Sequence, residues 1–261
     1  MYNEYFNESC LKTMQRMKTD CIDLVVTSPP YDNLRTYSGH DINFNFKKTA
    51  KLLYRVMKNN GVIVWIVGDQ TLHGNESLTS FKQALYFQKL GFKIFDTMIY
   101  QKTPRGAVGN DRSYWQTFEY MFIISKRAPR TINLLKDRKN VTEAKSAVYQ
   151  NRKPTGESRK GRAYQTTEYG RRGNVWLYHT GGNMAKDKIA FQHPAIMPDK
   201  LARDHILSWS NPGDVVYDPF AGSGTVLKQA KILNRNFIGS EINTAYCKII
   251  KARLNTLEDY I

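Results

Sequence analysis

Hydrophobic residues along the chain fall into short continuous runs, separated by segments in which apolar residues recur every third or fourth position. The continuous runs predict strands buried on both faces of a sheet, because such strands lose the polar alternation of a half-exposed strand. The predicted strands are Ile22–Thr27, Val62–Val67, Ile94–Tyr100, Phe118–Ser125, Val215–Tyr217 and Phe237–Gly239.

The segments between these runs predict helices. In the first of them Ala50, Leu53 and Val56 fall on one face, and Asn60-Gly61 supplies a stop signal. The predicted helices are Phe46–Asn59, Leu78–Leu90, Leu201–Ser210, Thr225–Leu233 and Thr244–Leu257. Strands that alternate with helices predict an α/β fold with a doubly wound, mostly parallel sheet. Phe118–Ser125 is expected to run antiparallel, because little chain separates it from the preceding strand.

A basic stretch without clear periodicity interrupts this alternation. Residues 126–188 contain 16 Lys and Arg against 5 Asp and Glu, in a chain whose net charge is +16. We therefore predict one α/β domain in two halves, 1–125 and 191–261, separated by a basic insert at 126–190. An excess of this size favours a polyanionic partner such as nucleic acid. A disordered basic loop is the alternative interpretation.

Seven basic side chains in the middle of this stretch are candidates for DNA contacts, since Arg and Lys meet phosphates and base edges. They are Arg152, Lys153, Arg159, Lys160, Arg162, Arg171 and Arg172.

The cysteines and the apolar runs limit the class of protein further. Cys10, Cys21 and Cys247 are far apart and form no CxxC pair, which argues against a disulfide framework and a metal site and indicates a reducing compartment. The N-terminus lacks a signal segment, and the run Val62–Val67 is too short to cross a bilayer. We expect a cytoplasmic protein with no membrane partner.

The first loop with chemical content is Thr27-Ser28-Pro29-Pro30-Tyr31, directly after a predicted strand. Open α/β sheets bind ligands at the carboxyl ends of their strands. Two consecutive prolines remove two N–H donors and leave carbonyl oxygens as acceptors in a rigid turn. The Ser28 hydroxyl and the Pro29 carbonyl suit an amino group, and Tyr31 offers an aromatic face to a base. An ordinary proline turn is the alternative.

The second such loop follows the predicted strand Val215–Tyr217, and its small residues let a ligand approach the backbone at a helix N-terminus. Its candidate cofactor-binding residues are Asp218, Phe220, Ala221, Gly222, Ser223, Gly224 and Thr225. Glu241 ends the next strand and can accept hydrogen bonds from ribose hydroxyls. The pattern is neither GxGxxG nor GxxxxGK[ST], so it favours a nucleoside without pyrophosphate.

Together these motifs resemble the amino-methyltransferase family of DNA-modifying enzymes, in the permuted subgroup where the (D/S)PPY loop precedes the FxGxG loop. His193, Pro194 and Ala195 resemble the HPA segment that closes around the methionine part of the cofactor. Asn7-Glu8-Ser9 stands where many relatives have Gly-Asp-Ser, so the resemblance makes Glu8 a candidate contact of the adenine. Gly68-Asp69 resembles a family loop that lines the pocket.

The resemblance implies a Rossmann-like methyltransferase fold, S-adenosylmethionine as cofactor, and methyl transfer to the exocyclic amino group of a flipped base in double-stranded DNA. Ser28 resembles the cytosine-N4 members, whereas adenine-N6 members usually carry Asp at that position, so cytosine N4 is expected and adenine N6 is the alternative. Methylation at carbon 5 is not expected, because no Cys precedes a Pro.

Further alternatives are a methyltransferase acting on RNA or on a protein amide, and a non-catalytic DNA-binding relative. The resemblance also implies a bacterial, archaeal or phage-encoded enzyme, in which residues 1–125 are the catalytic half, 126–190 the target-recognition insert and 191–261 the S-adenosylmethionine-binding half of one domain. The sequence leaves open whether a companion restriction endonuclease exists and whether the protein is a monomer or a homodimer.

Overall fold

The computed structural model describes residues 2–30, 44–103, 114–140, 146–148, 153–158, 163–165, 167–182 and 184–256. The chain divides into two compact units. One is formed by Met1–Asn133 together with Asn174–Ile261, and the other by Leu134–Gly173. The first unit therefore contains both loops that carry the candidate chemistry.

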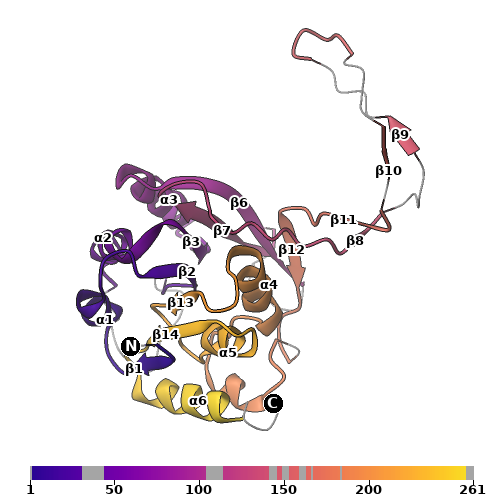
Figure 1. Ribbon diagram of the computed structural model, residues 1–261. Helices are drawn as coiled ribbons and strands as arrows, with labels where there is room; N and C mark the ends of the chain where they lie inside the picture. Colours follow the sequence, from indigo (N-terminus) through magenta and orange to yellow (C-terminus); the bar gives the residue numbers. More distant parts are fainter. Residues whose placement is uncertain are drawn as a thin grey trace. The chain divides into compact units, whose positions relative to one another are not determined.

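In the described part of the chain, the first unit is built on an eight-stranded sheet with the strand order β1-β14-β13-β2-β3-β7-β6-β12 (Figure 1). Its strands are β1 (Glu4–Phe6), β2 (Ile22–Thr27), β3 (Met57–Val67), β6 (Lys93–Lys102), β7 (Phe118–Ser125), β12 (Val175–Tyr178), β13 (Val215–Asp218) and β14 (Asn236–Ser240). β7 runs antiparallel to its neighbours β3 and β6, and every other neighbouring pair in this sheet is parallel. The predicted α/β fold with one antiparallel strand is confirmed.

Helices cover both faces of the sheet (Figure 1). They are α1 (Cys10–Arg16), α2 (Phe46–Val56), α3 (Thr79–Lys89), α4 (Asp199–Trp209), α5 (Thr225–Ile232), α6 (Thr244–Asn255) and the 3-10 helix η2 (Lys188–Gln192). Leu53 of α2 and Phe87 of α3 pack with Trp65 of β3 in one buried cluster, so α1 to α3 share one face. α4 and α5 contact β2, β13 and β14, and they pack against each other.

The predicted helices are all present, with ends that differ by a few residues. α2 ends at Val56 instead of Asn59, because Met57 has an extended backbone and pairs with Ile22 of β2. Burial of Met57 in the core outweighs the local stop signal at Asn60-Gly61.

Two parts of the sheet have no counterpart among the predicted elements. β1 and the helix α1 that follows it are short and lie in a polar stretch. β12 lies within the predicted insert at 126–190 and pairs in parallel with β6. Only Trp176 and Tyr178 of its four residues are buried, so its apolar signal is brief.

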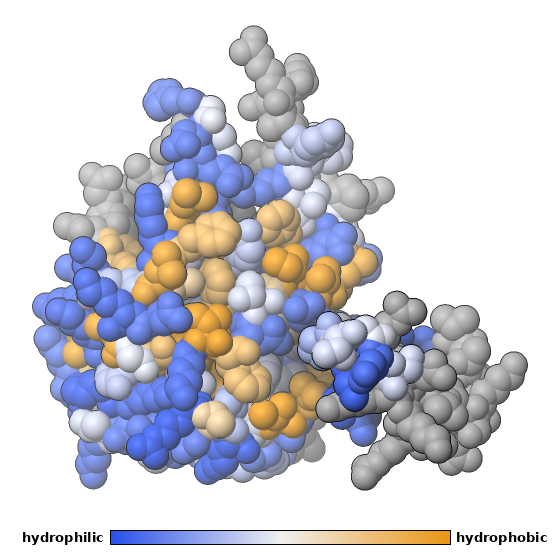
Figure 2. Space-filling model, turned by 90° about the horizontal axis from the view of Figure 1, so that it is seen from above, coloured by the Kyte–Doolittle hydropathy of each residue, from blue (hydrophilic) through white to orange (hydrophobic). Residues whose placement is uncertain are grey.

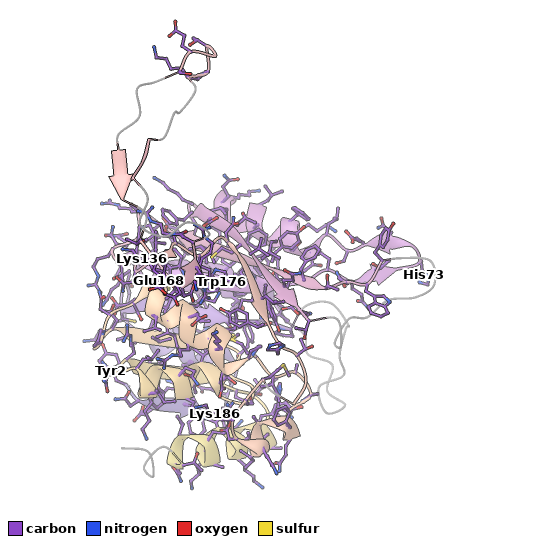
Figure 3. All side chains as sticks on the ribbon, turned by 90° about the vertical axis from the view of Figure 1, so that its right-hand side faces the viewer. Tyr2, His73, Lys136, Glu168, Trp176 and Lys186 are labelled. Carbon is purple, nitrogen blue, oxygen red and sulfur yellow. The ribbon has the colours of Figure 1, made fainter. Side chains whose placement is uncertain are left out.

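A two-stranded hairpin formed by β4 (Thr71–Leu72) and β5 (Asn75–Glu76) follows β3. His73 and Gly74 form its turn with φ angles of 51° and 79°, as a tight two-residue hairpin turn requires. Figure 3 shows His73 at the projecting tip of this hairpin. The hairpin extends the carboxyl end of β3 outward from the sheet.

Part of the sheet face that carries α3 is exposed. Phe118 of β7 and Leu177 of β12 both pair with Gln101 of β6, so their side chains lie on the same face of the sheet. Phe118 is 38% exposed and Leu177 is 59% exposed. Phe81 of α3 packs against Tyr120 with ring centroids 5.3 Å apart. Figure 2 shows several apolar residues gathered on one side of the molecule. The sheet thus extends beyond the helix that covers this face.

The second unit has two antiparallel ladders. β8 (Arg138–Lys139) pairs with β11 (Tyr169–Gly170), and β9 (Ser146–Val148) pairs with β10 (Ala163–Gln165). None of its described residues with an assigned burial is buried. Its 40 residues include 11 Lys and Arg against 4 Asp and Glu, an excess of seven positive charges. The unit is shorter than the predicted insert, because residues 126–133 and 174–190 belong to the first unit.

None of the helices in the described ranges is both long and apolar enough to pass through a membrane. Within those same ranges, no group of three or more His, Cys, Asp or Glu side chains is placed to hold a metal ion.

Candidate active site

The two candidate loops meet at the carboxyl edge of the sheet. β2 and β13 are parallel neighbours, with Leu24 opposite Val216 and Val25 opposite Tyr217. The Thr27 hydroxyl at the end of β2 donates a hydrogen bond of 2.7 Å to Asp218 at the end of β13. Residues separated by 191 positions in the chain thereby form one structural unit.

The described part of the Ser-Pro-Pro-Tyr loop faces a cavity at this edge. Ser28 and Pro30 are half-buried and line the cavity, whereas Pro29 is buried. Tyr31 lies outside the described residues. The structure therefore places Ser28 in the wall of the cavity, next to any ligand bound there.

The glycine-rich loop lines the same cavity through every one of its predicted residues except Gly224. Gly222 and Gly224 have positive φ angles of 52° and 77°. A Cβ at Gly222 would approach the His193 ring to 3.0 Å, and a Cβ at Gly224 would approach Ile250 to 3.0 Å. Glycine is needed at both positions because backbone conformation and space each disfavour a side chain.

Backbone hydrogen bonds fix the Glu241 carboxylate beside this loop. Its two oxygens accept from the Gly222 and Asn243 N–H groups, each at 2.8 Å. The Asn7 side chain after β1 donates to the Glu241 carbonyl at 2.9 Å. Each carboxylate oxygen has a second lone pair, so Glu241 can still accept from hydroxyl groups of a ligand.

Glu8 has a different environment from the one its motif suggested. Its carboxylate accepts from Thr13 at 2.8 Å and from both terminal nitrogens of Arg16 on α1. Hydrogen bonding from Arg16 is the largest influence and holds the pKa of Glu8 below its ordinary value. Its neighbours Ser9 and Cys10 line the cavity, whereas Glu8 does not.

The segment around His193 forms part of the cavity wall next to the glycine-rich loop. His193, Pro194 and Ala195 all line the cavity. The His193 Nδ1 accepts from the Ala195 N–H at 3.1 Å, and its ring lies 4.3 Å from that of Tyr246. These contacts hold the imidazole edge against Gly222, so the segment and the loop pack directly on each other.

The cavity between these walls has a volume of about 1650 Å³ and follows the carboxyl edge of the sheet. It extends from Glu241 past Asp218 and Ser28 to Gln70 and Trp115. Single small-molecule pockets usually enclose about 300–1000 Å³. The space therefore suits two adjacent ligands better than one.

Two carboxylates in the cavity wall have no cationic side chain as a hydrogen-bond or ion-pair partner among the residues that the structure describes. Burial raises the pKa of Asp218 to about 7, against the opposing effects of Thr27 and the Phe220 N–H. Burial also raises the pKa of Glu241. A positively charged ligand would offset the cost of burying these charges, so this end of the cavity favours a cation.

The end of the cavity near β3, β6 and β7 is polar and aromatic. The Asp69 carboxylate accepts from the Ser80 N–H at 2.9 Å and is thereby fixed. The buried Gln70 Oε1 has no hydrogen-bond partner among the described residues. Lys102 pairs with Glu119 at 2.5 Å, and Trp115 is 59% exposed at the rim. These groups offer hydrogen bonds and a stacking surface to a planar ligand.

The predicted DNA-contacting residues are only partly described. Arg152, Arg159, Lys160 and Arg162 lie outside the described residues. Lys153 pairs with Glu157 at 2.7 Å, and Arg172 forms an ion pair with Asp137. Arg171 is exposed.

Sequence reasoning did not identify several functional candidates. Lys136 and Lys139 are exposed cations in the second unit. Trp115 and Lys102 line the cavity although no motif contains them. Arg253 is completely buried beneath the glycine-rich loop. In sequence it is one basic residue near the end of a helix, so no local signal distinguishes it from a solvent-exposed one.

Comparison with known proteins agrees with this geometry. A family model described as DNA methylase (N6_N4_Mtase) matches residues 22–252. The orphan methyltransferase M.BamHII of Bacillus amyloliquefaciens is 54% identical over 240 residues, which cover 90% of this chain and 89% of that protein. The type II methyltransferase M.HpaI of Haemophilus parainfluenzae is 29% identical over 256 residues, covering 95% of this chain and 73% of the relative.

Solved structures with the same fold include the M1.HpyAVI–SAM complex, with a TM-score of 0.65, 22% identity and coverage of 97% of this chain and 98% of the other. The PvuII DNA methyltransferase, described as cytosine-N4-specific, has a TM-score of 0.66 and 18% identity, with coverage of 98% and 90%. At these identities the likeness concerns the fold.

Proposed function

Because the chain belongs to the N6_N4 family of DNA methylases, we propose that it transfers a methyl group from S-adenosylmethionine to N4 of a cytosine in DNA. The observation that carries the choice of base is Ser28 at the first position of the Ser-Pro-Pro-Tyr loop. Its position in the cavity wall, one residue from the Thr27–Asp218 hydrogen bond, supports a direct role.

The residues at the glycine-rich end fit S-adenosylmethionine. Asp218 and Glu241 are buried carboxylates whose pKa values are raised by burial, and a sulfonium cation supplies the missing positive charge. Glu241 would accept hydrogen bonds from the ribose hydroxyls. The wall formed by His193, Pro194 and Ala195 would enclose the methionine part.

The cofactor supplies a methyl group bonded to a positively charged sulfur, which leaves as a neutral thioether. The protein's task is to place the amino nitrogen in line with that methyl group. In this proposal the Ser28 hydroxyl and the Pro29 carbonyl accept the two amino hydrogens, which directs the nitrogen lone pair at the methyl group. With the cofactor bound, the new N–C bond would replace the S–C bond, and the nitrogen would then lose a proton to water.

Hydrogen-bond acceptors at this position stabilise the positive charge that develops on the nitrogen. A strong base is unnecessary, because the nitrogen becomes acidic once it is methylated. A serine hydroxyl is therefore sufficient where other members of the family carry a carboxylate.

The size of the cavity and its polar far end support a flipped base as the second ligand. A base stacked inside a duplex cannot bring its amino group into a cavity at the edge of the sheet, so it must rotate out of the helix. In this proposal Gln70 hydrogen-bonds such a base and Trp115 stacks on it, since both residues line the cavity. We propose that the basic second unit, including Lys153, Arg171 and Arg172, contacts the phosphates of the surrounding duplex.

Expression in a methylation-deficient bacterium, followed by nucleoside analysis and sequencing that reports modified bases, tests this function. We expect N4-methylcytosine at one recurring sequence, absent from a strain that expresses Ser28→Ala. N6-methyladenine in its place would refute the choice of base but preserve the class of enzyme. Unmodified DNA, with the purified protein folded and supplied with S-adenosylmethionine, would refute the proposed activity.

A further inference from the structure

The buried Arg253 near the end of α6 is the centre of a polar cluster that none of the recognised motifs includes. Its side chain is fully buried, with an exposed fraction of 0%. The guanidinium donates to Asp187 at 2.8 Å and to Asp199 at 2.9 Å. Lys228 of α5 also pairs with Asp187, at 3.0 Å. Two cations and two carboxylates thus neutralise one another inside the protein, as buried charges must.

The same guanidinium also holds the glycine-rich loop. It donates to the Ser223 carbonyl at 2.9 Å and to the Thr225 hydroxyl at 2.8 Å. These two residues flank Gly224, whose left-handed backbone has no side chain to stabilise it. Arg253 therefore supports the loop from the side that faces away from the cavity.

The two carboxylates mark the ends of a segment that we call the strap, residues 187–199. Asp187 directly precedes η2, and Asp199 is the first residue of α4. Between them lies the wall that contains His193, Pro194 and Ala195, and this wall lines the cavity. Both ends of the strap are bound to one side chain, and that side chain also binds the glycine-rich loop.

We propose that Arg253 is a positioning residue for cofactor binding, which holds the strap against the glycine-rich loop. This inference rests on the proposed function, because it assumes that the cofactor lies between these two walls. Arg253 does not line the cavity, so it acts through the residues that it binds. Its planar group of five donors matches acceptors on four residues, two at the ends of the strap and two in the glycine-rich loop, which a lysine ammonium on a flexible stem cannot do.

Arg235 provides a matched control. It is also buried, with an exposed fraction of 7%, and it donates to Ser210 and to the Leu233 carbonyl. None of these three residues lines the cavity. Loss of a buried guanidinium at Arg235 therefore reports general destabilisation without a change in the strap.

The experiment compares Arg253→Lys with Arg235→Lys by thermal unfolding, by calorimetric titration with S-adenosylmethionine, and by hydrogen exchange of the unliganded proteins. We expect both variants to have a lower Tm. Only Arg253→Lys should bind the cofactor about tenfold or more weakly, as the loss of charge-assisted hydrogen bonds predicts. Only this variant should show faster exchange of the amides between residues 188 and 198.

Equal loss of affinity in both variants, or unchanged affinity and exchange in Arg253→Lys, would overturn the inference. If Arg253→Lys does not fold, Asp199→Ala removes the acceptor at one end of the strap and is expected to increase strap exchange in the same way; unchanged exchange would count against the positioning role. If the wild-type protein does not bind S-adenosylmethionine, the proposed function fails. The exchange measurement still tests the link between Arg253 and the strap.

Discussion

Replacing Asp218 by asparagine tests the electrostatics of the cavity directly. The carboxyl is 3% exposed, and burial raises its pKa from 3.8 to about 7. One of its oxygens accepts from Thr27 at 2.7 Å and from the Phe220 N–H at 3.0 Å. An asparagine oxygen can accept both hydrogen bonds, so Asp218→Asn reproduces the shape of the neutral acid without its titration.

The shift in the pKa of Asp218 sets the size and the sign of the effect on stability. About three pKa units correspond to about 4 kcal/mol at 1.36 kcal/mol per unit. The pKa of Asp218 is higher in the folded than in the unfolded state, so the protonated carboxyl stabilises the folded protein. This stabilisation is fully present below about pH 4 and is lost as the pH rises to about 7. Relative to Asp218→Asn, the wild-type protein should therefore lose about 4 kcal/mol of unfolding free energy between pH 4 and pH 8.

Urea unfolding of both proteins across this range measures the difference, because every other titrating group is shared. If the free energies of unfolding of the wild-type protein and Asp218→Asn change with pH by the same amount, Asp218 is not a buried carboxylate without a cationic partner. If the wild-type protein instead gains unfolding free energy relative to Asp218→Asn as the pH rises, Asp218 has a cationic partner in solution.

The same titration predicts how cofactor binding depends on pH. A cationic ligand favours the ionised carboxylate, so the Kd of the wild-type protein for S-adenosylmethionine should fall about tenfold from pH 6 to pH 8. Ionisation of the ligand itself is common to both proteins and cancels in the comparison. Equal pH dependence of the Kd in wild type and Asp218→Asn would exclude this coupling.

Three further variants have expected outcomes. Ser28→Ala removes a hydrogen-bond acceptor needed in the transition state, so it should reduce the rate of single-turnover methylation by about 100-fold or more. The Kd for S-adenosylmethionine should change less than about twofold. Full activity of this variant would contradict a catalytic role of Ser28. Glu241→Gln should weaken cofactor binding about tenfold, as measured by calorimetry. The glutamine NH2 group would face one of the two backbone N–H donors, Gly222 or Asn243, that the carboxylate now accepts from. Replacing Lys136, Lys139 and Arg171 by Gln should lower the slope of log K for DNA against log salt by about two to three, and an unchanged slope would exclude the second unit as the DNA contact.

Local sequence was sufficient to predict most of the fold. Continuous apolar runs predicted the central strands, because a strand such as β2 is buried on both faces and has no exposed residue. Strand and helix ends were less predictable. Met57 shows why: a core position and a partner strand decide its conformation against the local stop signal.

The motif residues Ser28 and Asp218 could be identified from sequence because their chemistry depends on local features: prolines that shape a turn, and small residues that expose backbone beside an acid. Their proximity could only be expected by resemblance, since they lie 190 positions apart and meet through the pairing of β2 with β13. Burial by that packing is also what raises the pKa of Asp218.

Tertiary structure alone decided the role of residues whose local sequence is ordinary. Arg253 is a basic residue in the last turn of a helix, yet folding buries it among acceptors from three distant segments. Glu8 stands in a recognisable motif, yet folding pairs its carboxylate with Arg16, a partner that the motif does not predict. A sequence pattern records which residues prefer burial and which turns they form. Only packing decides which distant partners a buried charge acquires, and those partners determine what the charge can do.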